Sequence, residues 1–298
     1  MIVTAANRLM SLRDLLLGIT VVVIFGLNFV VVKIALEDFP PILLLVLRFG
    51  LVAVLLGPFL RWPTGRFRDL VAYSIVLGLL HFSVMYVSLS VMDASLAAIL
   101  IQTQVPMTAL LAAVFLKEGF GWRRGLGLAI ASIGVVILVG GPVHDSPWWA
   151  IVGVLIGAGL YAIATLQMKA FSDMPPTQLN GWLAVLTTPQ LLTLSLVIEQ
   201  AHWSALTTAS VTGWAAILWQ SVVIVIFCFG IWYRLLSRNG VNDVMPLTLL
   251  VPLVGVIGGV TVLGEAMTIE LILGGLVTVV GVAIMQIRWR PPKPSVPA

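Results

Sequence analysis

The sequence predicts an all-α integral membrane protein whose ten transmembrane helices form two inverted repeats of five helices. Three observations carry this prediction: the apolar composition, the positions of the cations, and two motifs that recur in both halves. The 298 residues are 60% hydrophobic and 9% charged, and their mean hydropathy is +1.12. Soluble domains carry about 25% charged residues. Because a membrane-spanning helix needs about 20 apolar residues, the chain is long enough for ten of them.

Ten apolar runs follow one another, and no polar stretch between them is long enough for a soluble domain. Their approximate bounds are 13–33, 42–60, 70–91, 95–116, 123–140, 148–169, 177–197, 213–236, 243–263 and 270–287. The first run ends at Lys33 without a small-x-small cleavage pattern. We therefore expect a retained first span and not a signal peptide.

The cations give the orientation. With the N-terminus in the cytoplasm, fourteen of the sixteen Lys and Arg residues fall on the cytoplasmic side, as the positive-inside rule requires. They are Arg8, Arg13, Arg61, Arg66, Arg68, Lys117, Arg123, Arg124, Lys169, Arg234, Arg238, Arg288, Arg290 and Lys293. Ten spans place the C-terminus on the same side, so both termini are predicted to be cytoplasmic.

Composition also argues against several other classes of protein. The cations lie in ones and twos between apolar runs, which does not indicate a nucleic-acid surface. All Asp and Glu residues lie in loops or at span ends. The single cysteine, Cys228, cannot form an intramolecular disulfide. His144 and His202 lie in loops, far in sequence from His81, so neither a metal site nor a cofactor is expected.

Two motifs recur in both halves of the chain. Glu118 is followed by Gly127 and Gly134, and Glu265 by glycines at the same spacings; Asp-x-Pro-Pro occurs at 38–41 and again at 173–176. We therefore divide the chain into a first five-helix repeat, 1–142, and a second, 143–298, with a short cytoplasmic tail. Because five is odd, the second repeat enters the membrane from the opposite side, as in transporters that work by alternating access.

Central prolines occur at equivalent places in the fourth and ninth runs. Pro106 and Pro252 lack an N–H group, so the carbonyls of Gln102 and Thr248 lose their helical partners. In a bilayer such carbonyls need another donor, from a neighbouring helix, water or a substrate. We expect broken helices here, with a binding site or a simple kink as the two readings.

Polar and aromatic groups at mid-membrane depth are the candidate substrate-binding residues, since buried polar groups need partners. His81 could donate, accept or titrate, or form a helix–helix hydrogen bond. Gln102 and Gln104 lie about 200° apart on a helix, so only one can face a given cavity. The full set is Asn28, His81, Tyr86, Gln102, Gln104, Tyr161, Trp182, Trp219 and Thr248.

Two cations lie away from the cytoplasmic side. Lys33 is near the outer end of the first run and is expected to snorkel. Arg48 lies seven residues inside the second run, about 10 Å deep, and must be paired. Glu37 or Asp38 is expected to supply the counter-charge, or else a substrate carboxylate does. With Pro106 and Pro252, these two residues form the predicted structural or gating set.

Several segments resemble the EamA-type exporters of the drug/metabolite transporter superfamily. They are FGLNFVVVKIAL followed by Pro-Pro, LRF with Arg48, DASLAAILIQTQVP, FLKE and, in the second half, LLVPLVG with its GE block. The resemblance extends from Gly26 to Trp289. It implies a central cavity and export of small metabolites such as amino acids, aromatic ones included, across a bacterial inner membrane.

The functional prediction is an exporter and not an enzyme. A small metabolite is bound near the midplane, and the two repeats rock to expose it alternately. Without a midplane carboxylate, facilitated transport, or at most coupling through His81, is expected. The alternatives are a polytopic membrane enzyme, for which GxSxG, HExxH and P-loop motifs are missing, and an exporter of drugs or nucleobase-type metabolites. Small-molecule substrate and lipid are the expected partners, nucleic acid is not, and we expect a monomer with a dimer as the alternative.

Overall fold

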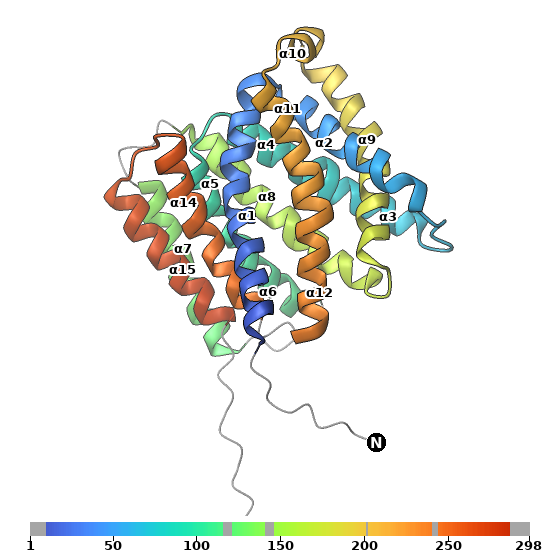
Figure 1. Cartoon of the computed structure of the whole chain (residues 1–298). Helices are drawn as coiled ribbons and strands as arrows, with labels where there is room; N and C mark the ends of the chain where they lie inside the picture. Colours follow the sequence, from blue (N-terminus) through green and yellow to red (C-terminus); the bar gives the residue numbers. More distant parts are fainter. Residues whose placement is uncertain (1–9, 116–120, 141–145, 201, 240–243, 287–298) are drawn as a thin grey trace, which may run out of the picture.

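The computed structural model describes residues 10–115, 121–140, 146–200, 202–239 and 244–286, which form a bundle of long helices (Figure 1). Nine stretches are long and apolar enough to cross a membrane, and Ile269–Met285 is a tenth, shorter apolar helix. The predicted all-α membrane fold is confirmed. In hydrocarbon only a helix or a closed barrel satisfies every backbone hydrogen bond, which explains why apolar runs of this length are helical.

The first half contains five spans, three of which are assembled from shorter segments. The elements are α1 (Leu12–Asp38), α2 (Pro41–Leu56) with η1 (Gly57–Phe59), α3 (Phe67–Tyr73) with η2 (Ser74–His81) and α4 (Phe82–Ser90), α5 (Ala94–Leu100) with η3 (Ile101–Thr103) and α6 (Gln104–Phe115), and α7 (Trp122–Gly140).

The second half contains the other five spans and one short helix, α10. Its elements are α8 (Trp148–Met168) with η4 (Lys169–Phe171), α9 (Pro176–Ile198), α10 (His202–Thr208), α11 (Val211–Leu218) with η5 (Trp219–Cys228) and α12 (Phe229–Asn239), η6 (Met245–Leu249) with α14 (Leu250–Val262), and α15 (Ile269–Gln286). We call the end of the bundle where α10 lies the α10 end, and the opposite end, where α1 begins, the N-terminal end; they are the top and bottom of Figure 1.

The recurring Asp-x-Pro-Pro motifs both start a helix. Pro41 is the first residue of α2 and Pro176 the first residue of α9, and in each case the preceding proline is the N-cap. Proline suits this position because its fixed φ is helical and the N–H that it lacks would have no partner in the first turn. The two motifs lie at opposite ends of the bundle, as an inverted repeat requires.

The recurring glycines pack against one another between α7 and α15, which lie side by side (Figure 1). A Cβ atom on Gly127 would meet the Gly281 carbonyl, and one on Gly134 would meet the Gly274 carbonyl. In the repeat, Gly127 corresponds to Gly274, and Gly134 corresponds to Gly281. Gly127 therefore faces the counterpart of Gly134, and Gly134 faces the counterpart of Gly127. This crosswise pairing is what a two-fold axis produces. The helices are therefore antiparallel, and the axis passes between them.

Helix interruptions also recur in equivalent spans. The third span contains the π-helix η2 and the eighth contains the π-helix η5. The fourth span contains a 3-10 segment that ends three residues before Pro106, and the ninth contains one that ends three residues before Pro252. Both prolines are the third residue of the α-helix that follows. The broken helices predicted from the prolines are thus present, with i→i+3 turns where the i→i+4 bond is lost.

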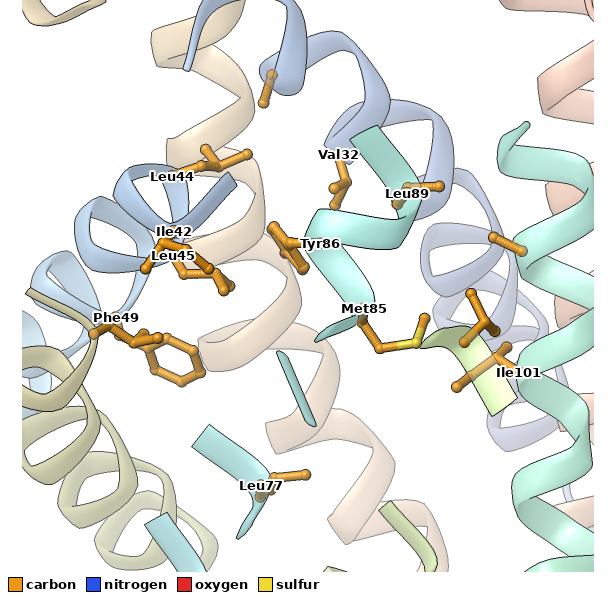
Figure 2. Close-up of a cluster of buried hydrophobic side chains, with 14 of the residues drawn as sticks. Val32, Ile42, Leu44, Leu45, Phe49, Leu77, Met85, Tyr86, Leu89 and Ile101 are labelled. Carbon is orange, nitrogen blue, oxygen red and sulfur yellow. The ribbon is translucent and has the colours of Figure 1, made fainter. Parts of the chain in front are cut away.

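The main buried cluster extends across both repeats. Figure 2 shows α4 between two groups of its members, with Tyr86 on the side of Leu45 and Phe49 from α2, and Met85 on the side of Ile101. All these side chains are buried. This cluster therefore fixes the direction in which Tyr86 leaves α4.

Candidate functional site

A buried arginine on α2 stands at the centre of the most polar part of the interior. Arg48 is 4% exposed, and its Nη1 donates to the Tyr86 hydroxyl at 2.7 Å. Tyr86 in turn donates to Gln220 Oε1 at 2.5 Å. Ser221 Oγ donates to the Arg48 carbonyl at 3.1 Å. The second, third and eighth spans are thus joined, through α2, α4 and η5, by one hydrogen-bonded chain. We call this chain the Arg48 cluster (Arg48, Tyr86, Gln220).

The proton positions in this chain follow from the chemistry of its members. Arginine only donates, so the Tyr86 oxygen must accept from Arg48 and give its own proton to Gln220. Gln220 therefore accepts from Tyr86 through its side-chain oxygen, and its amide nitrogen remains available as a donor. The structure gives no partner to that nitrogen, nor to Arg48 Nε, although both atoms are buried. The atoms left unsatisfied at the cluster are both hydrogen-bond donors.

Aromatic rings surround the guanidinium group. Its Cζ lies 4.8 Å from the Phe82 ring centroid, 5.3 Å from that of Phe49 and 5.9 Å from that of Tyr86. The negative faces of aromatic rings attract a cation, although much less strongly than a carboxylate does at contact distance. The rings therefore stabilise the charge in part and leave its hydrogen-bonding edge available.

The counter-charge expected from Glu37 or Asp38 does not come from either residue. Asp38 instead accepts a hydrogen bond from Ser210, at the start of α11. Among the described residues, no carboxylate lies within ion-pair distance of Arg48. The physical reason is distance along the helices: Asp38 lies at the α10 end, whereas Arg48 is about two turns of helix deeper, toward the middle of the bundle.

His81 forms a hydrogen bond between helices. Its Nδ1 lies 2.8 Å from the Gly157 carbonyl oxygen of α8. A carbonyl only accepts, so Nδ1 carries a proton and, in the neutral ring, Nε2 is the acceptor. The ring centroid is 4.9 Å from Phe82 and 5.4 Å from Tyr161. The Phe82 ring thus contacts both His81 and Arg48.

Tyr161 lies on the inward face of α8 and is partly exposed. Around the axis of α8, Tyr161 lies within about 40° of Val154 and Gly157, which are on the buried face. It lies about 150° from Ile156 and Ile163, which are on the outer face. Its side chain is nevertheless 37% exposed. Met168, two turns further on the Tyr161 face, lines a cavity of about 500 Å³ with Phe171, Tyr233 and Arg234. This cavity therefore lies at the N-terminal end of the bundle, two turns beyond Tyr161 along α8.

The α10 end is held together by three charged residues that cap helix ends. Lys33 donates to the carbonyls of Leu89 at 3.0 Å, Ser90 at 3.4 Å and Met92 at 2.7 Å, after α4. Glu265 accepts from the amides of Ala94 (2.6 Å) and Ser95 (2.9 Å) at the start of α5, and from the Ser95 hydroxyl. Glu199 accepts from the amides of Ile42 (2.7 Å) and Leu43 (2.8 Å) at the start of α2. We call Lys33, Glu199 and Glu265 the α10-end caps.

These caps place opposite charge at each helix terminus, as the helix dipole favours. Glu199 and Glu265 come from the second repeat and cap helices of the first, so they close one repeat onto the other. Gly264, at φ +69°, makes the left-handed turn after α14 that returns Glu265 toward α5. Lys33, expected to snorkel, is bonded to backbone carbonyls instead. The helix end offers it three acceptors without the need to reach bulk water.

The remaining sequence-predicted residues lie at several levels of the bundle. Asn28 is half-buried and its Oδ1 has no partner in the described chain, whereas Thr248 donates locally to the Met245 carbonyl at 2.7 Å. Gln102 is buried and Gln104 half-buried, on either side of the η3–α6 junction. The Trp219 indole N–H is buried without a partner. Thr248 lies in the first turn of the ninth span, whereas the others lie further inside their spans.

Trp182 stands apart from that group. Its indole N–H donates to the Arg61 carbonyl at 3.0 Å, and its ring meets Trp62 at a centroid distance of 5.7 Å. It therefore lies at the N-terminal end, beside a surface groove of about 650 Å³ lined by Trp62, Arg66, Asp173 and Gln178. The structure thus brings Tyr86, His81 and Tyr161 into one region with Arg48, and leaves Trp182 outside it.

Three residues of this region escaped the sequence analysis: Gln220, Phe82 and Phe49. Gln220 could have been found by the criterion applied to Gln102, an amide within an apolar run. The two phenylalanines carry no such signal, because their role depends on which helix faces Arg48. Only the packing of α2 against α4 reveals them.

Nine membrane-length helices and a tenth, shorter one, with helix interruptions in equivalent spans of both halves of the described chain, define a multi-pass membrane protein with the internal repeat typical of transporters. The sequence profile of the EamA-like transporter family matches the chain twice, over residues 12–140 and 148–287. The chain belongs to this family.

Relatives and a solved structure agree with this assignment. A Salmonella typhimurium protein named probable amino-acid metabolite efflux pump is 31% identical over 94% of this chain and 97% of its own length. An Escherichia coli protein of the same name is 29% identical over 94% and 98%. An uncharacterised transporter of Bacillus subtilis is 23% identical over 89% and 93%. A crystal structure that shares 18% identity has a TM-score of 0.63, with 91% of this chain and 96% of that chain covered, and shows the same fold.

Proposed function

We propose that this protein exports amino acids and related small metabolites across a bacterial inner membrane by alternating access. The family supplies the transport activity, and the two relatives named as amino-acid metabolite efflux pumps favour this class of substrate. The observation that carries the mechanism is the asymmetry of the bundle: one end is closed by the α10-end caps, and a cavity of about 500 Å³ lies at the other end, beside Met168 and Tyr233.

The positive-inside distribution supports a cytoplasmic N-terminal end. In that orientation the structure is closed to the outside and open toward the cytoplasm, the state in which an exporter takes up its load. The central contacts agree with this reading. Gly255 packs on Ala98 and Gly259 on Ser95, so α14 touches α5, the half of the fourth span nearest the α10 end.

The same glycines favour a monomer. Gly255 and Gly259 form a small-x-x-x-small face of the kind that brings helices together in membranes. Here Gly255 lies against Ala98 and the Gly26 carbonyl, within one chain. The motif is therefore occupied by internal packing, and a dimer would need another face.

We further propose facilitated transport without a carboxylate proton relay. No Asp or Glu in the described part of the chain is fully buried. His81 remains the titratable group closest to the passage, and its Nδ1 is held by Gly157. Collapse of a proton gradient by an ionophore should leave uptake into proteoliposomes unchanged.

Uptake of radiolabelled amino acids into proteoliposomes tests the proposed function. Saturable, protein-dependent uptake is expected. Tyr161→Ala should raise the KM roughly severalfold, because an aromatic contact is worth about 1 kcal/mol. Ile163→Ala, on the outer face of the same helix, is the matched control and should transport like the wild type. Equal effects of both variants, or no uptake of any amino acid by the folded protein, would contradict the proposal.

A further inference from the structure

We propose that Arg48 binds the carboxylate group of the transported molecule, and that the substrates are monocarboxylates with an apolar or aromatic body. This inference rests on the proposed function and specifies its substrate class. A free α-amino group is not a requirement of the site, so N-acylated amino acids and simple aromatic carboxylates belong to the same class. Amides, esters and amines with the same body do not.

The first reason is an uncompensated charge. Arg48 is buried inside a membrane-spanning bundle, and no described carboxylate pairs with it. A guanidinium group cannot lose its proton in a protein, so the charge remains at any accessible pH. A buried charge without a counter-ion is costly, and chains keep such groups in membranes for functional reasons. An anionic ligand would remove this cost.

The second reason is the kind of atom left without a partner. Arg48 Nε and Gln220 Nε2 are both buried donors, and their assignment follows from the fixed direction of the Arg48–Tyr86–Gln220 chain. A carboxylate has two oxygens with about four acceptor sites and no proton to donate. Such an acceptor-only group matches both of these atoms in hydrogen-bonding character. An ammonium group or a neutral amide N–H would meet donors instead.

The third reason is the surroundings of the guanidinium group. Phe49 and Phe82 lie within 5.3 Å of the Arg48 Cζ, and His81 and Tyr161 continue the series of rings from Phe82. A ligand held at Arg48 by its carboxylate would place its body against these rings, on the side that leads to the accessible face of α8. Flat or apolar bodies suit such a lining.

The position of the cluster also fits. Arg48 lies seven residues into α2 from the α10 end, about 10 Å deep, and Gln220 lies nine residues into the eighth span from the same end. Tyr161 is deeper still, thirteen residues into α8. The cluster is therefore at the closed end of the passage, where a ligand that enters from the cytoplasm stops. The α10-end caps lie beyond it.

A matched ligand series tests the recognition of the carboxylate. The full-length protein in proteoliposomes would take up radiolabelled phenylalanine against unlabelled N-acetylphenylalanine, 3-phenylpropionate, phenylalanine amide or phenethylamine. The same compounds would be tested in detergent for a shift in Tm. We expect competition and stabilisation by the first two compounds. The amide and the amine should bind roughly tenfold to a hundredfold less well, the range for lost charge-assisted hydrogen bonds.

Substitutions assign the effect to Arg48. Arg48→Gln should abolish the preference for carboxylates over amides, whereas Arg48→Lys, which keeps the charge but not the fork of donors, should retain part of it. Tyr86→Phe keeps the ring and releases the guanidinium, and should weaken carboxylate binding with little effect on the amide. Arg68→Gln removes an exposed cation and is the matched control. Circular dichroism and gel filtration of each variant establish that it is folded.

The two proposals fail in different ways. If phenylalanine is transported and the amide competes as well as N-acetylphenylalanine, the assignment of Arg48 is wrong and the proposed function stands. The same conclusion follows if Arg48→Gln is folded and keeps the wild-type preference. If neither phenylalanine nor any other amino acid or carboxylate of the panel is bound by the folded wild type, both proposals are wrong.

Discussion

The two ends of this bundle are held by different chemistry. At the α10 end, Glu199 and Glu265 accept from backbone amides of the other repeat, and Lys33 donates to the carbonyls that follow α4. At the N-terminal end, Arg66 and Asp173 form an ion pair between side chains that are 38% and 67% exposed. Caps on helix ends are partly buried and directional, whereas an exposed pair is screened by water and salt.

This difference indicates which end is closed in the present structure. Breaking one carboxylate cap leaves two or three donors without partners, so the α10 end opens only at a considerable cost. Parting Arg66 from Asp173 leaves both groups in water. A transporter that alternates must be able to exchange these roles, and the two-fold axis between α7 and α15 provides equivalent halves for doing so.

Loss of a cap at the α10 end should have the largest effect. Glu265→Gln keeps the shape of the side chain but removes the charge that three donors share, and should reduce the stability of the closed end by about 2 kcal/mol. We expect faster labelling of a cysteine at Ala97, a buried residue of α5, by an external thiol reagent, in a background with Cys228→Ser. Glu270→Gln, an acid in the first turn of α15, is the control. Unchanged labelling would show that Glu265 does not hold this end.

Lys33→Met should have an intermediate effect. The substitution removes the hydrogen bonds to the carbonyls of Leu89, Ser90 and Met92 but keeps an unbranched side chain of similar length. Hydrogen bonds from a charged donor are worth about 1.5–3 kcal/mol, and water near the α10 end can replace part of them. A Tm lowered by a few degrees is expected, measured by intrinsic fluorescence in detergent. A Tm equal to that of the wild type would mean that Lys33 reaches water as readily as it reaches these carbonyls.

The sequence predicted the architecture more fully than the site. Spans, glycine spacings and prolines are local signals, and each has a counterpart in the structure: helices, a crosswise glycine contact, and 3-10 segments. Arg48 and Tyr86 were both named, yet their connection through Gln220 was not, because it joins three spans far apart in the chain. Glu265 was noted only as a marker of the repeat. Its capping of α5 depends on how the ninth span lies against the fourth, which periodicity does not contain.

The exposed pair at the N-terminal end should give the smallest effect, and a pH-dependent one. The Arg66 guanidinium, hydrogen-bonded to Asp173, lowers the pKa of that carboxyl below its usual value. A lowered pKa in the folded state means that the pair stabilises the fold above the carboxyl's unfolded pKa. This contribution is lost as the pH falls through the lowered value.

Asp173→Asn should therefore change transport slightly at neutral pH and low salt, and not at all at 1 M salt, where charges are screened within about 3 Å. Asp69→Asn, nearby on α3, is the control. A large, salt-independent loss of uptake in Asp173→Asn alone would place at this end a contact as strong as the α10-end caps.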